Sequence, residues 1–298
     1  MRSQAGTMSV QPVCAVVVTY RPDATVLEHL RNILPQVQRL VVIDNGSSVD
    51  EISPLRAASS ALCFHLIENS DNLGIAEALN QGVRWAIAQR YGWVILFDQD
   101  SAVTPGFIDQ MFDAWDTHAG RKRLASIHPR YVDPITGNEL HIPRAADGSP
   151  IFPMTSGSLM PVWIFDTIGW FASEYFIDLV DWEYAFRIRA AGFLIGQSNR
   201  AKLWHSPGNP AELSVFGRAF QHSRHDAMRR YYISRNSVAL YRSYLFSYPA
   251  WVLRALCRQI HDTVVCLVAG QNRARQFWSV LIGTWDGLTG RMGKRERP

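Results

Sequence analysis

The chain has 298 residues, of which 47% are hydrophobic and 19% charged, so it can bury a sizeable core and is neither disordered nor fibrous. Its length favours one large domain or one domain with an appendage. The net charge of +4 hides an asymmetry, because residues 1–198 carry −7 and residues 199–298 carry +11, and a basic segment predicts a surface for phosphates, nucleic acid or anionic lipid.

Strands and helices are predicted to alternate in the first part of the chain. Short apolar runs predict four buried strands, at 13–19, 40–43, 61–67 and 93–97. Helical spacing of apolar residues predicts three helices, over 24–38, 74–90 and about 105–117. This alternation is typical of an α/β domain with a mostly parallel sheet. Pro, Gly and Asp then favour loop or hairpin over 130–153, and beyond about 210 the chain becomes helical, aromatic and arginine-rich.

Polar residues follow every predicted strand. They are Thr19 and Tyr20, Asp44 and Asn45, Glu68 and Asn69, and Asp98, Gln99 and Asp100. Because ligands of open α/β sheets bind beyond the carboxyl ends of the strands, we expect these residues to form a site.

Two of these strand ends carry carboxylates with a chemical use. Asp98 and Asp100 can both reach one cation once the chain leaves strand geometry, and oxygen ligands suit Mg²⁺ or Mn²⁺ beside substrate phosphates. A plain polar turn explains the same pattern equally well. Asp44 can accept hydrogen bonds from a ribose or a pyrimidine imide, or close an Asx-type turn.

The segment 72–82 combines small residues with two asparagines. Tight helix packing explains Gly74 and the other small residues, whereas packing does not readily explain Asn72 and Asn80. The chain has no G-x-G-x-x-G after its first strand and no P-loop motif, which disfavours a dinucleotide-binding Rossmann enzyme and excludes a P-loop enzyme.

Charged residues of the second half allow a functional and a structural interpretation. Asp181 and Glu183 stand at a predicted helix start, where they serve either as a general base or as acids stabilised by the helix dipole. His205 follows a possible strand and is either a metal or phosphate ligand or a structural histidine. Arg235 can bind a diphosphate, or be one solvated arginine among many.

Four cysteines without C-x-x-C spacing, Cys14, Cys63, Cys257 and Cys266, are predicted to be reduced and buried in a cytosolic protein. Residues 1–12 contain no apolar signal-peptide core, and no run of 18 apolar residues predicts a membrane-spanning helix.

Taken together, these motifs resemble family 2 glycosyltransferases of the GT-A fold, and among them the bacterial rhamnosyltransferases. The matching segments follow in the expected order: VVVTYRP at 16–22, VVIDNGS at 41–47, NLGIAEALNQG at 72–82, LFDQDS at 96–101, SGSLM at 156–160, FIDLVDWEYAFRIRAAGF at 176–193, LWHSPG at 203–208 and YYISRNSVALYR at 231–242. The resemblance covers about residues 13–245. It implies a GT-A catalytic domain over 13–210, with a Rossmann-like, mostly parallel sheet, and a basic helical C-terminal region over 211–298.

The resemblance also implies roles for individual residues. Nucleotide contacts fall on Thr19, Tyr20, Arg21, Asp44, Asn45, Asn72, Gly74, Asn80, Asp98 and Gln99. The implied ligands of the metal, Mg²⁺ or Mn²⁺, are Asp98, Asp100 and His205. The implied contacts of the sugar or acceptor are Ser156, Gly157 and Trp182. The diphosphate falls on Arg235 and the catalytic base on Asp181. Because Val180 stands where the family usually has Glu, Glu183 stays open as an alternative base.

The implied activity is inverting, metal-dependent transfer of a sugar, with L-rhamnose from dTDP-β-L-rhamnose favoured, to a saccharide or lipid-linked acceptor in the synthesis of bacterial cell-surface polysaccharide. Another UDP- or GDP-sugar donor, a sugar-nucleotide hydrolase and a non-catalytic binding module remain alternatives. No nucleic-acid partner is expected.

The tail over 243–285 interleaves apolar and aromatic residues with arginines, which suits helices lying on an anionic bilayer at the cytoplasmic face. Helices that cap the catalytic domain or form a homo-oligomer interface explain this pattern equally well.

Overall fold

A computed structural model describes residues 12–145, 148–205, 210–215, 218–223, 226–269 and 273–296 of the chain. In the first half the elements are β1 (Val13–Thr19), α1 (Val26–Ile33), a 3₁₀ turn (Leu34–Gln36), β2 (Arg39–Asp44), α2 (Val49–Ala61), β3 (His65–Glu68), α3 (Ile75–Ala88), β4 (Trp93–Asp98), β5 (Ala102–Val103), α4 (Phe107–Thr117), a second 3₁₀ turn (Arg121–Arg123) and β6 (Leu124–Val132). In the second half they are β7 (Leu159–Pro161), α5 (Trp163–Ile168), a third 3₁₀ turn (Ser173–Tyr175), α6 (Val180–Ala190), β8 (Leu194–Trp204), β9 (Pro210–Val215), β10 (Arg218–Ser223), α7 (Ala227–Tyr244), α8 (Pro249–Ala269) and α9 (Arg273–Thr289).

The larger sheet has the strand order β3-β2-β1-β4-β7-β6-β8-β5. Strands β3, β2, β1 and β4 run parallel, as do β6 and β8, whereas β7 and β5 run antiparallel to their neighbours. The parallel register sets Thr19 beside Asp44 and Val18 beside Asp98. The predicted α/β fold with a mostly parallel sheet is confirmed, and its strand ends meet at one edge.

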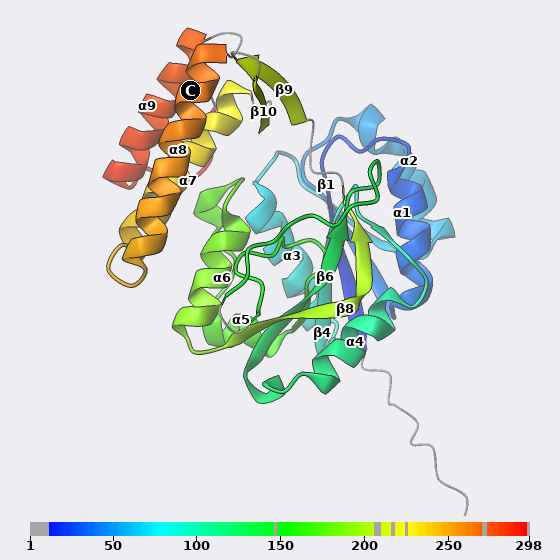
Figure 1. Cartoon of the computed structure of the whole chain (residues 1–298). Coiled ribbons are helices and arrows are strands. Elements are labelled where there is room, and N and C mark those ends of the chain that lie inside the picture. Colours follow the sequence, from blue (N-terminus) through cyan, green and yellow to red (C-terminus); the bar gives the residue numbers. More distant parts are fainter. Residues whose placement is uncertain are drawn as a thin grey trace, which may run out of the picture.

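Helices cover both faces of the sheet, and successive side chains of β1 point to the two faces in turn. Val13, Ala15 and Val17 are buried against the apolar residues of α1, α2 and α4. Cys14, Val16 and Val18 share the other core with α3, α5 and α6. Figure 1 shows α1 and α2 on one side of the sheet and α3, α5 and α6 on the other.

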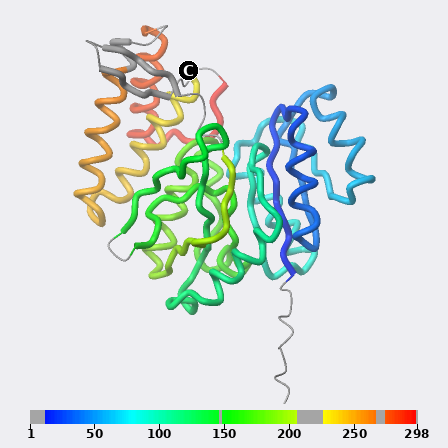
Figure 2. The backbone as a smooth tube through the Cα atoms, turned by 45° about the vertical axis from the view of Figure 1, so that its right-hand side comes forward, coloured from blue at the N-terminus to red at the C-terminus, as the bar shows by residue number. Residues whose placement is uncertain are grey.

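The C-terminal region forms three helices beside this domain, with α7 and α8 next to α6 in the chain trace of Figure 2. Helix α9 lies closely against α7, since a Cβ atom at Gly287 would stand 2.5 Å from the carbonyl oxygen of Arg235. The Tyr231 hydroxyl on α7 also donates to the buried Asp286 on α9, at 2.8 Å. The predicted helical extension is confirmed, and α9 is part of its packing.

Two expectations for local structure were wrong. The strand predicted over 61–67 begins only at His65, because Ala61 still ends α2. Helix α2 starts with a capping box in which Ser48 and Glu51 bond each other's backbone. Residues 210–215 and 218–223 form the antiparallel pair β9 and β10 rather than helix.

The prediction of buried cysteines holds for Cys14 alone among the described side chains. Cys63 is exposed in the turn after α2, and Cys257 is exposed on α8. The Cys266 side chain and residues 1–11 lie outside the described part. No helix in the described ranges is long and apolar enough to cross a membrane.

Candidate active site

The ends of β1 and β2 are joined by side-chain hydrogen bonds. Thr19 Oγ1 donates to Asp44 Oδ1 at 3.0 Å, and both carboxylate oxygens also accept from Ser47, at 2.6 Å from its hydroxyl and 2.9 Å from its backbone N–H. Asp44 is only 1% exposed. The Asx-type turn that the sequence allowed is therefore present, and it fixes this carboxylate at the sheet edge.

Asparagines continue this polar edge toward α3. Asn45 Nδ2 donates to Asn72 Oδ1 at 3.1 Å, and Asn45 Oδ1 accepts from the backbone N–H of Leu73 at 3.0 Å and from Asn69 Nδ2 at 3.2 Å. Asn72 Oδ1 also accepts from the backbone N–H of Gly74 at 2.9 Å. The predicted nucleotide contacts Asn45 and Asn72 thus lie side by side in one network.

An aromatic and cationic pair lies at the outer side of this network, to which the backbone N–H of Arg21 connects it by donating to the Ser47 hydroxyl at 2.8 Å. Tyr20 is 39% exposed, and the Arg21 guanidinium lies 5.1 Å from the centre of its ring. The backbone N–H of Tyr20 donates to Gln99 Oε1 at 2.8 Å, which links the end of β1 to the turn after β4. These three predicted residues are therefore neighbours of the carboxylates that follow β4.

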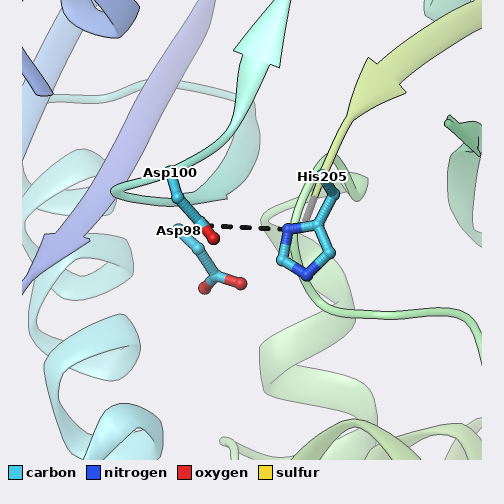
Figure 3. Close-up of side chains that lie close together, drawn as sticks. All are labelled: Asp98, Asp100 and His205. Atoms are coloured by element: carbon cyan, nitrogen blue, oxygen red, sulfur yellow. Dashed lines mark ion pairs between the residues drawn. The ribbon is translucent and has the colours of Figure 1, made fainter. Parts of the chain in front are cut away.

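Asp98, Asp100 and His205 form one cluster at this edge (Figure 3), and they offer ligand atoms within 4.8 Å of one another. The short pairing of β5 with the end of β8 brings His205 here, because Ala102 is the register partner of Trp204. The backbone N–H of Asp98 donates to the Ser156 hydroxyl at 3.2 Å, which fixes the end of β4.

The electrostatics of this cluster fit a bound cation. His205 Nδ1 lies 3.7 Å from Asp100 Oδ1, which is too long for a hydrogen bond, and this buried nitrogen has no hydrogen-bond partner among the described residues. The pKa of Asp98 is raised to about 6, because burial disfavours its charge; His205 opposes the shift and Asp100 adds to it. A divalent ion on these three ligands would satisfy the orphaned nitrogen and offset the buried negative charge.

Asp181 lies in the first turn of α6, after a strained segment. Phe176, Asp178 and Leu179 all have positive φ angles, between 61° and 63°. Such backbone costs energy and persists only where its surroundings enforce it. Asn236 on α7 provides that enforcement, because its side-chain N–H groups donate to the carbonyl oxygens of Tyr175, Ile177 and Asp178 at 2.7–3.0 Å.

The environment of Asp181 suits proton transfer near neutral pH. Its pKa is raised to about 7, mainly because burial disfavours the charge, and the charges of Asp178 and Asp98 raise it further. The backbone N–H of Trp182 opposes the shift by donating to Asp181 Oδ1 at 2.9 Å. A carboxyl with this pKa can accept a proton from a hydroxyl group at physiological pH.

The other acid of α6 has a structural partner. Glu183 accepts from Arg187 at 2.6 and 2.7 Å, and Arg187 also donates to the carbonyl oxygens of Ile168 and Trp170. Burial raises the pKa of Glu183, and the ion pair with Arg187 opposes the shift. Of the two candidate bases, Asp181 is therefore the one whose carboxylate forms no ion pair with the residues that the structure describes.

Known proteins share this architecture and part of this sequence. Residues 14–131 match the family model described as Glycosyl transferase family 2. This part of the chain, which holds β1 to β6, is therefore similar to family 2 glycosyltransferases. A dTDP-rhamnosyl transferase, RfbF from Shigella flexneri, is 25% identical over 306 residues, covering 94% of this chain and 97% of that protein. The protein is thus a glycosyltransferase that resembles rhamnosyltransferases.

Solved structures agree on the fold of this glycosyltransferase. A mannosyltransferase from Pyrobaculum calidifontis, in complex with GDP-Man and Mn²⁺, has a TM-score of 0.55 and 14% identity, covering 94% of this chain and 87% of that one. TarS 1–349 from S. aureus has a TM-score of 0.54 and 12% identity, covering 94% of this chain and 72% of that one. The predicted GT-A fold is confirmed.

Several predicted site residues of the glycosyltransferase have internal partners instead. The Asn80 amide is engaged by the backbone N–H and carbonyl of Phe171, and Arg235 is fully buried, with its guanidinium donating to the carbonyl oxygens of Glu174, Tyr175 and Gly293. Neither side chain has a free polar edge for a nucleotide or a diphosphate, so the structure corrects both assignments to packing roles.

The two glycines predicted to contact ligand are also closely packed. A Cβ atom at Gly74 would lie 2.5 Å from the carbonyl oxygen of Phe176, and one at Gly157 would lie 2.7 Å from the Pro129 side chain. Both have positive φ angles. Packing and backbone conformation thus explain these glycines. Trp182 stacks on Phe152 at 4.4 Å between ring centres.

Sequence reasoning missed the residues that hold the site in place. Ser47 completes the polar network beside Asn69, a residue that was expected at this edge, and Ser101 bonds the Ser156 hydroxyl at 2.6 Å. Ser47 follows the predicted site residues Asp44 and Asn45, so its strand-end position was a usable signal. Asn236 had no such signal, because its partners are carbonyl groups about 60 residues earlier in the chain.

Proposed function

We propose that this glycosyltransferase is inverting and depends on a divalent metal, and that it transfers L-rhamnose from dTDP-β-L-rhamnose to a hydroxyl group of a saccharide or lipid-linked acceptor in cell-surface polysaccharide synthesis. One observation carries the proposal: the Asp98, Asp100 and His205 cluster lies at the same sheet edge as the nucleotide-side network, close enough to Asp181 for the charge of Asp98 to raise its pKa.

Asp98, Asp100 and His205 would hold Mg²⁺ or Mn²⁺, because two carboxylates and an imidazole whose Nδ1 has no hydrogen-bond partner among the described residues are a ligand set that suits these ions. When bound, the ion supplies Lewis-acid stabilisation of the charge on the departing diphosphate. The mannosyltransferase with a similar fold was solved with GDP-Man and Mn²⁺, which supports a divalent ion here.

Asp181 takes the proton of the acceptor hydroxyl in this mechanism. The hydroxyl oxygen forms a bond to the anomeric carbon while the bond from that carbon to the β-phosphate oxygen breaks, and the electron pair leaves with the nucleoside diphosphate. A single displacement inverts the anomeric configuration and needs one base, not the two carboxylates of a glycosidase. Glu183 positions Arg187 and the end of α5 and has no role in proton transfer.

The nucleotide of the donor is bound by Thr19, Asp44, Asn45 and Asn72, and Tyr20 and Arg21 lie at the outer edge of this site. The rhamnosyl donor is supported by the 25% identity to the dTDP-rhamnosyl transferase over nearly the whole chain. Another UDP- or GDP-sugar is the alternative donor. Thermal-shift measurements with dTDP-, UDP- and GDP-sugars and Mn²⁺ decide between them, because ligand binding to the native state raises the melting temperature. A larger shift with UDP- or GDP-sugars would reject the rhamnosyl donor.

The base is tested by Asp181→Asn. We expect turnover to fall by about two to four orders of magnitude with donor affinity nearly unchanged, because the carboxamide cannot accept the proton. Turnover close to that of the wild type would eliminate Asp181 as the base. Glu183→Gln is the matched control on the same helix, and its turnover should stay within a few-fold of the wild type.

The metal is tested by Asp100→Ala. Donor binding should weaken in this variant and should weaken in the wild type after EDTA treatment. Donor binding that responds to neither change would refute the metal site. Nucleotide release with and without a saccharide acceptor separates a transferase from a sugar-nucleotide hydrolase, which needs no acceptor, and from a non-catalytic module, which releases none.

We further propose that residues 13–210 catalyse the reaction and that the region over 211–298 rests on an anionic bilayer. Apolar side chains of α8 and α9 are exposed: Leu253, Leu256, Ile260, Val264, Phe277, Trp278, Leu281, Trp285 and Leu288. These side chains recur at helical spacing along α8 and α9, so each helix has an exposed apolar face, and exposed apolar surface of this kind is typical of an interaction site. The positive charge of the region favours anionic lipid over an uncharged partner surface.

This surface is tested by flotation with phosphatidylglycerol-containing liposomes. Deleting the chain after about residue 245 is unsuitable, because α9 packs into α7 through Asp286 and Gly287. Trp278→Ser with Trp285→Ser leaves that packing intact, since both side chains are about 60% exposed. The double variant should lose flotation and Ile135→Ser, on an exposed loop, should keep it. Equal flotation of the double variant would reject the membrane surface and favour a homo-oligomer.

A further inference from the structure

The chain reverses its direction after α9 and returns along α7. Gly290 has a φ angle of 74°, and the backbone N–H of Arg291 donates to the carbonyl oxygen of Asp286 at 2.8 Å. A left-handed glycine followed by this hydrogen bond is a Schellman motif, which ends a helix. We call residues 290–296, which follow this helix end, the post-α9 segment.

Hydrogen bonds fix the post-α9 segment on α7 and on the loop before α6. The N–H of Gly293 donates to the carbonyl oxygen of Glu174 at 2.8 Å, and the carbonyl oxygen of Gly293 accepts from the Arg235 guanidinium. The N–H of Arg295 donates to the Tyr232 hydroxyl at 2.9 Å. The segment is therefore part of the folded structure, and the side chains that it carries have defined places.

Lys294 reaches from this segment to the loop between β3 and α3. Its ammonium group donates to Asp71 Oδ2, and Asp71 Oδ1 accepts from the backbone N–H of Asn72 at 2.8 Å. These two bonds lower the pKa of Asp71, and the bond from Lys294 contributes more than the bond from Asn72. One carboxylate thus links the post-α9 segment to a predicted nucleotide contact.

The loop at Asp71 has further contacts with the nucleotide-side network. Asn72 Oδ1 accepts from Asn45 Nδ2 at 3.1 Å and from the backbone N–H of Gly74 at 2.9 Å. A Cβ atom at Gly46 would lie 2.4 Å from the carbonyl carbon of Asp71, so the loop also packs tightly on the turn after β2. A shift of Asp71 would therefore disturb the contact between Asn72 and Asn45.

The ion pair of Lys294 with Asp71 contributes little to overall stability. The two side chains are 38% and 65% exposed, and exposed ion pairs add little to the free energy of unfolding. The bonds of Gly293 and Arg295 hold the post-α9 segment without it. Among the ion pairs of the described residues, however, it alone joins the region after β10 to the nucleotide-side loops. Its place in the structure therefore indicates a role in positioning.

We propose that Lys294 is a positioning residue of the donor site: by pairing with Asp71, it holds the loop that carries Asn72 in the arrangement that receives the nucleotide. This inference rests on the proposed function, which assigns Asn72 to the nucleotide. It adds to the donor site a residue from outside the range 14–131 that matches the family model. The affinity for the donor then depends on a segment that follows the C-terminal helices.

The test is isothermal titration calorimetry of the full chain with Mn²⁺ and whichever of dTDP, UDP and GDP the wild type binds most tightly. Lys294→Gln should weaken binding about three- to fivefold in about 0.05 M NaCl, the upper range of what an exposed ion pair contributes. In about 1 M NaCl the difference should disappear, because salt screens exposed charges and the wild type loses the pair too. Equal binding at low salt, or a difference that persists at high salt, overturns the positioning role.

Two matched variants separate this ion pair from a general effect of substitution. Lys294→Arg keeps the cation and should bind within about twofold of the wild type. Lys122→Gln makes the same charge change as Lys294→Gln at an exposed lysine of the second 3₁₀ turn, and should bind as the wild type does. An equal loss of affinity in either variant would overturn the assignment to the ion pair. In turnover assays, Lys294→Gln should raise the KM for donor and leave kcat within about twofold, because Asp181 is unchanged.

A double-mutant cycle tests the link through Asp71. Asp71→Asn removes the same ion pair from the other side and keeps Oδ1 as an acceptor for the N–H of Asn72. Because both residues act through one contact, the double variant with Lys294→Gln should bind no more weakly than either single variant. Losses of affinity that multiply in the double variant would overturn the proposal.

Failure of this inference differs from failure of the proposed function. A wild type that binds a nucleoside diphosphate with Mn²⁺, together with a Lys294→Gln variant that binds it equally well, overturns the role of Lys294 and leaves the donor site standing. A wild type that binds none of the three nucleoside diphosphates overturns the transferase proposal itself.

Discussion

The raised pKa of Asp181 has a consequence for stability that can be measured without any substrate. Replacing Asp181 with Asn removes a titrating group whose pKa moves from 3.8 to about 7 on folding. Each pKa unit corresponds to 1.36 kcal/mol, so the full shift corresponds to about 4 kcal/mol. The side chain is only partly buried, and solvent screening reduces the expected effect to about 2 kcal/mol.

The sign of the effect follows from proton binding. Between pH 3.8 and about 7 the folded state keeps the Asp181 proton and the unfolded state has lost it, so the free energy of unfolding falls as pH rises through this window. Asparagine does not titrate, so the free energy of unfolding of the variant does not fall for this reason. We therefore expect Asp181→Asn to match the wild type near pH 4 and to be more stable by about 2 kcal/mol at pH 8.

Urea unfolding of both proteins at pH 4, 6 and 8 measures this difference. Asp109→Asn, which changes an exposed carboxylate on α4, is the matched control and should show no gain that grows with pH. A difference between Asp181→Asn and the wild type that is the same at all three pH values would refute the argument that burial disfavours this charge. Together with the loss of turnover, the gain would show that catalysis is maintained here at a cost in stability.

Three further variants test other contacts. Glu183→Ala leaves Arg187 half-buried without its carboxylate partner and should lower the free energy of unfolding in urea by about 3 kcal/mol; an unchanged value would refute a stabilising ion pair. Asn236→Ala removes three hydrogen bonds to the segment before α6 and should cost about 2 kcal/mol, with kcat falling more than the KM for donor rises; an unchanged kcat would argue against a positioning role. His205→Ala should weaken Mn²⁺ binding, measured by calorimetry, at least tenfold, and unchanged Mn²⁺ affinity would remove His205 from the ligand set.

The strand-end carboxylates were predictable because short-range patterns decide them. An apolar run followed by Asp98 and Asp100 indicates a buried strand and its carboxyl end, and parallel pairing with β1 places Asp98 beside Val18, the residue before Thr19. His205 could be named from its motif, but its position depends on β5, a strand of two residues that no periodicity reveals. Its approach to Asp100 is a property of the folded sheet.

The predicted ligand contacts of Arg235 and Asn80 were wrong because long-range contacts decide where these side chains lie. Polar side chains in a motif were taken to face a ligand, whereas both are buried and bond backbone carbonyl or N–H groups far away in the sequence. Sequence patterns do not distinguish a polar residue that meets substrate from one that satisfies the backbone of a distant loop. The capping box of Ser48 and Glu51, by contrast, is a local signal that could have revealed α2.

The contact between Asn236 and the segment before α6 ties the catalytic carboxylate to the C-terminal helices. Asp178 and Leu179 have positive φ angles, which are costly for residues other than glycine. The hydrogen bond from Asn236 on α7 helps to hold this backbone conformation. A displacement of α7 would therefore move the carbonyl groups of the turn that precedes Asp181. We expect a chain that ends before α7 to be inactive even with both substrates present, because the residue that holds this turn would be missing.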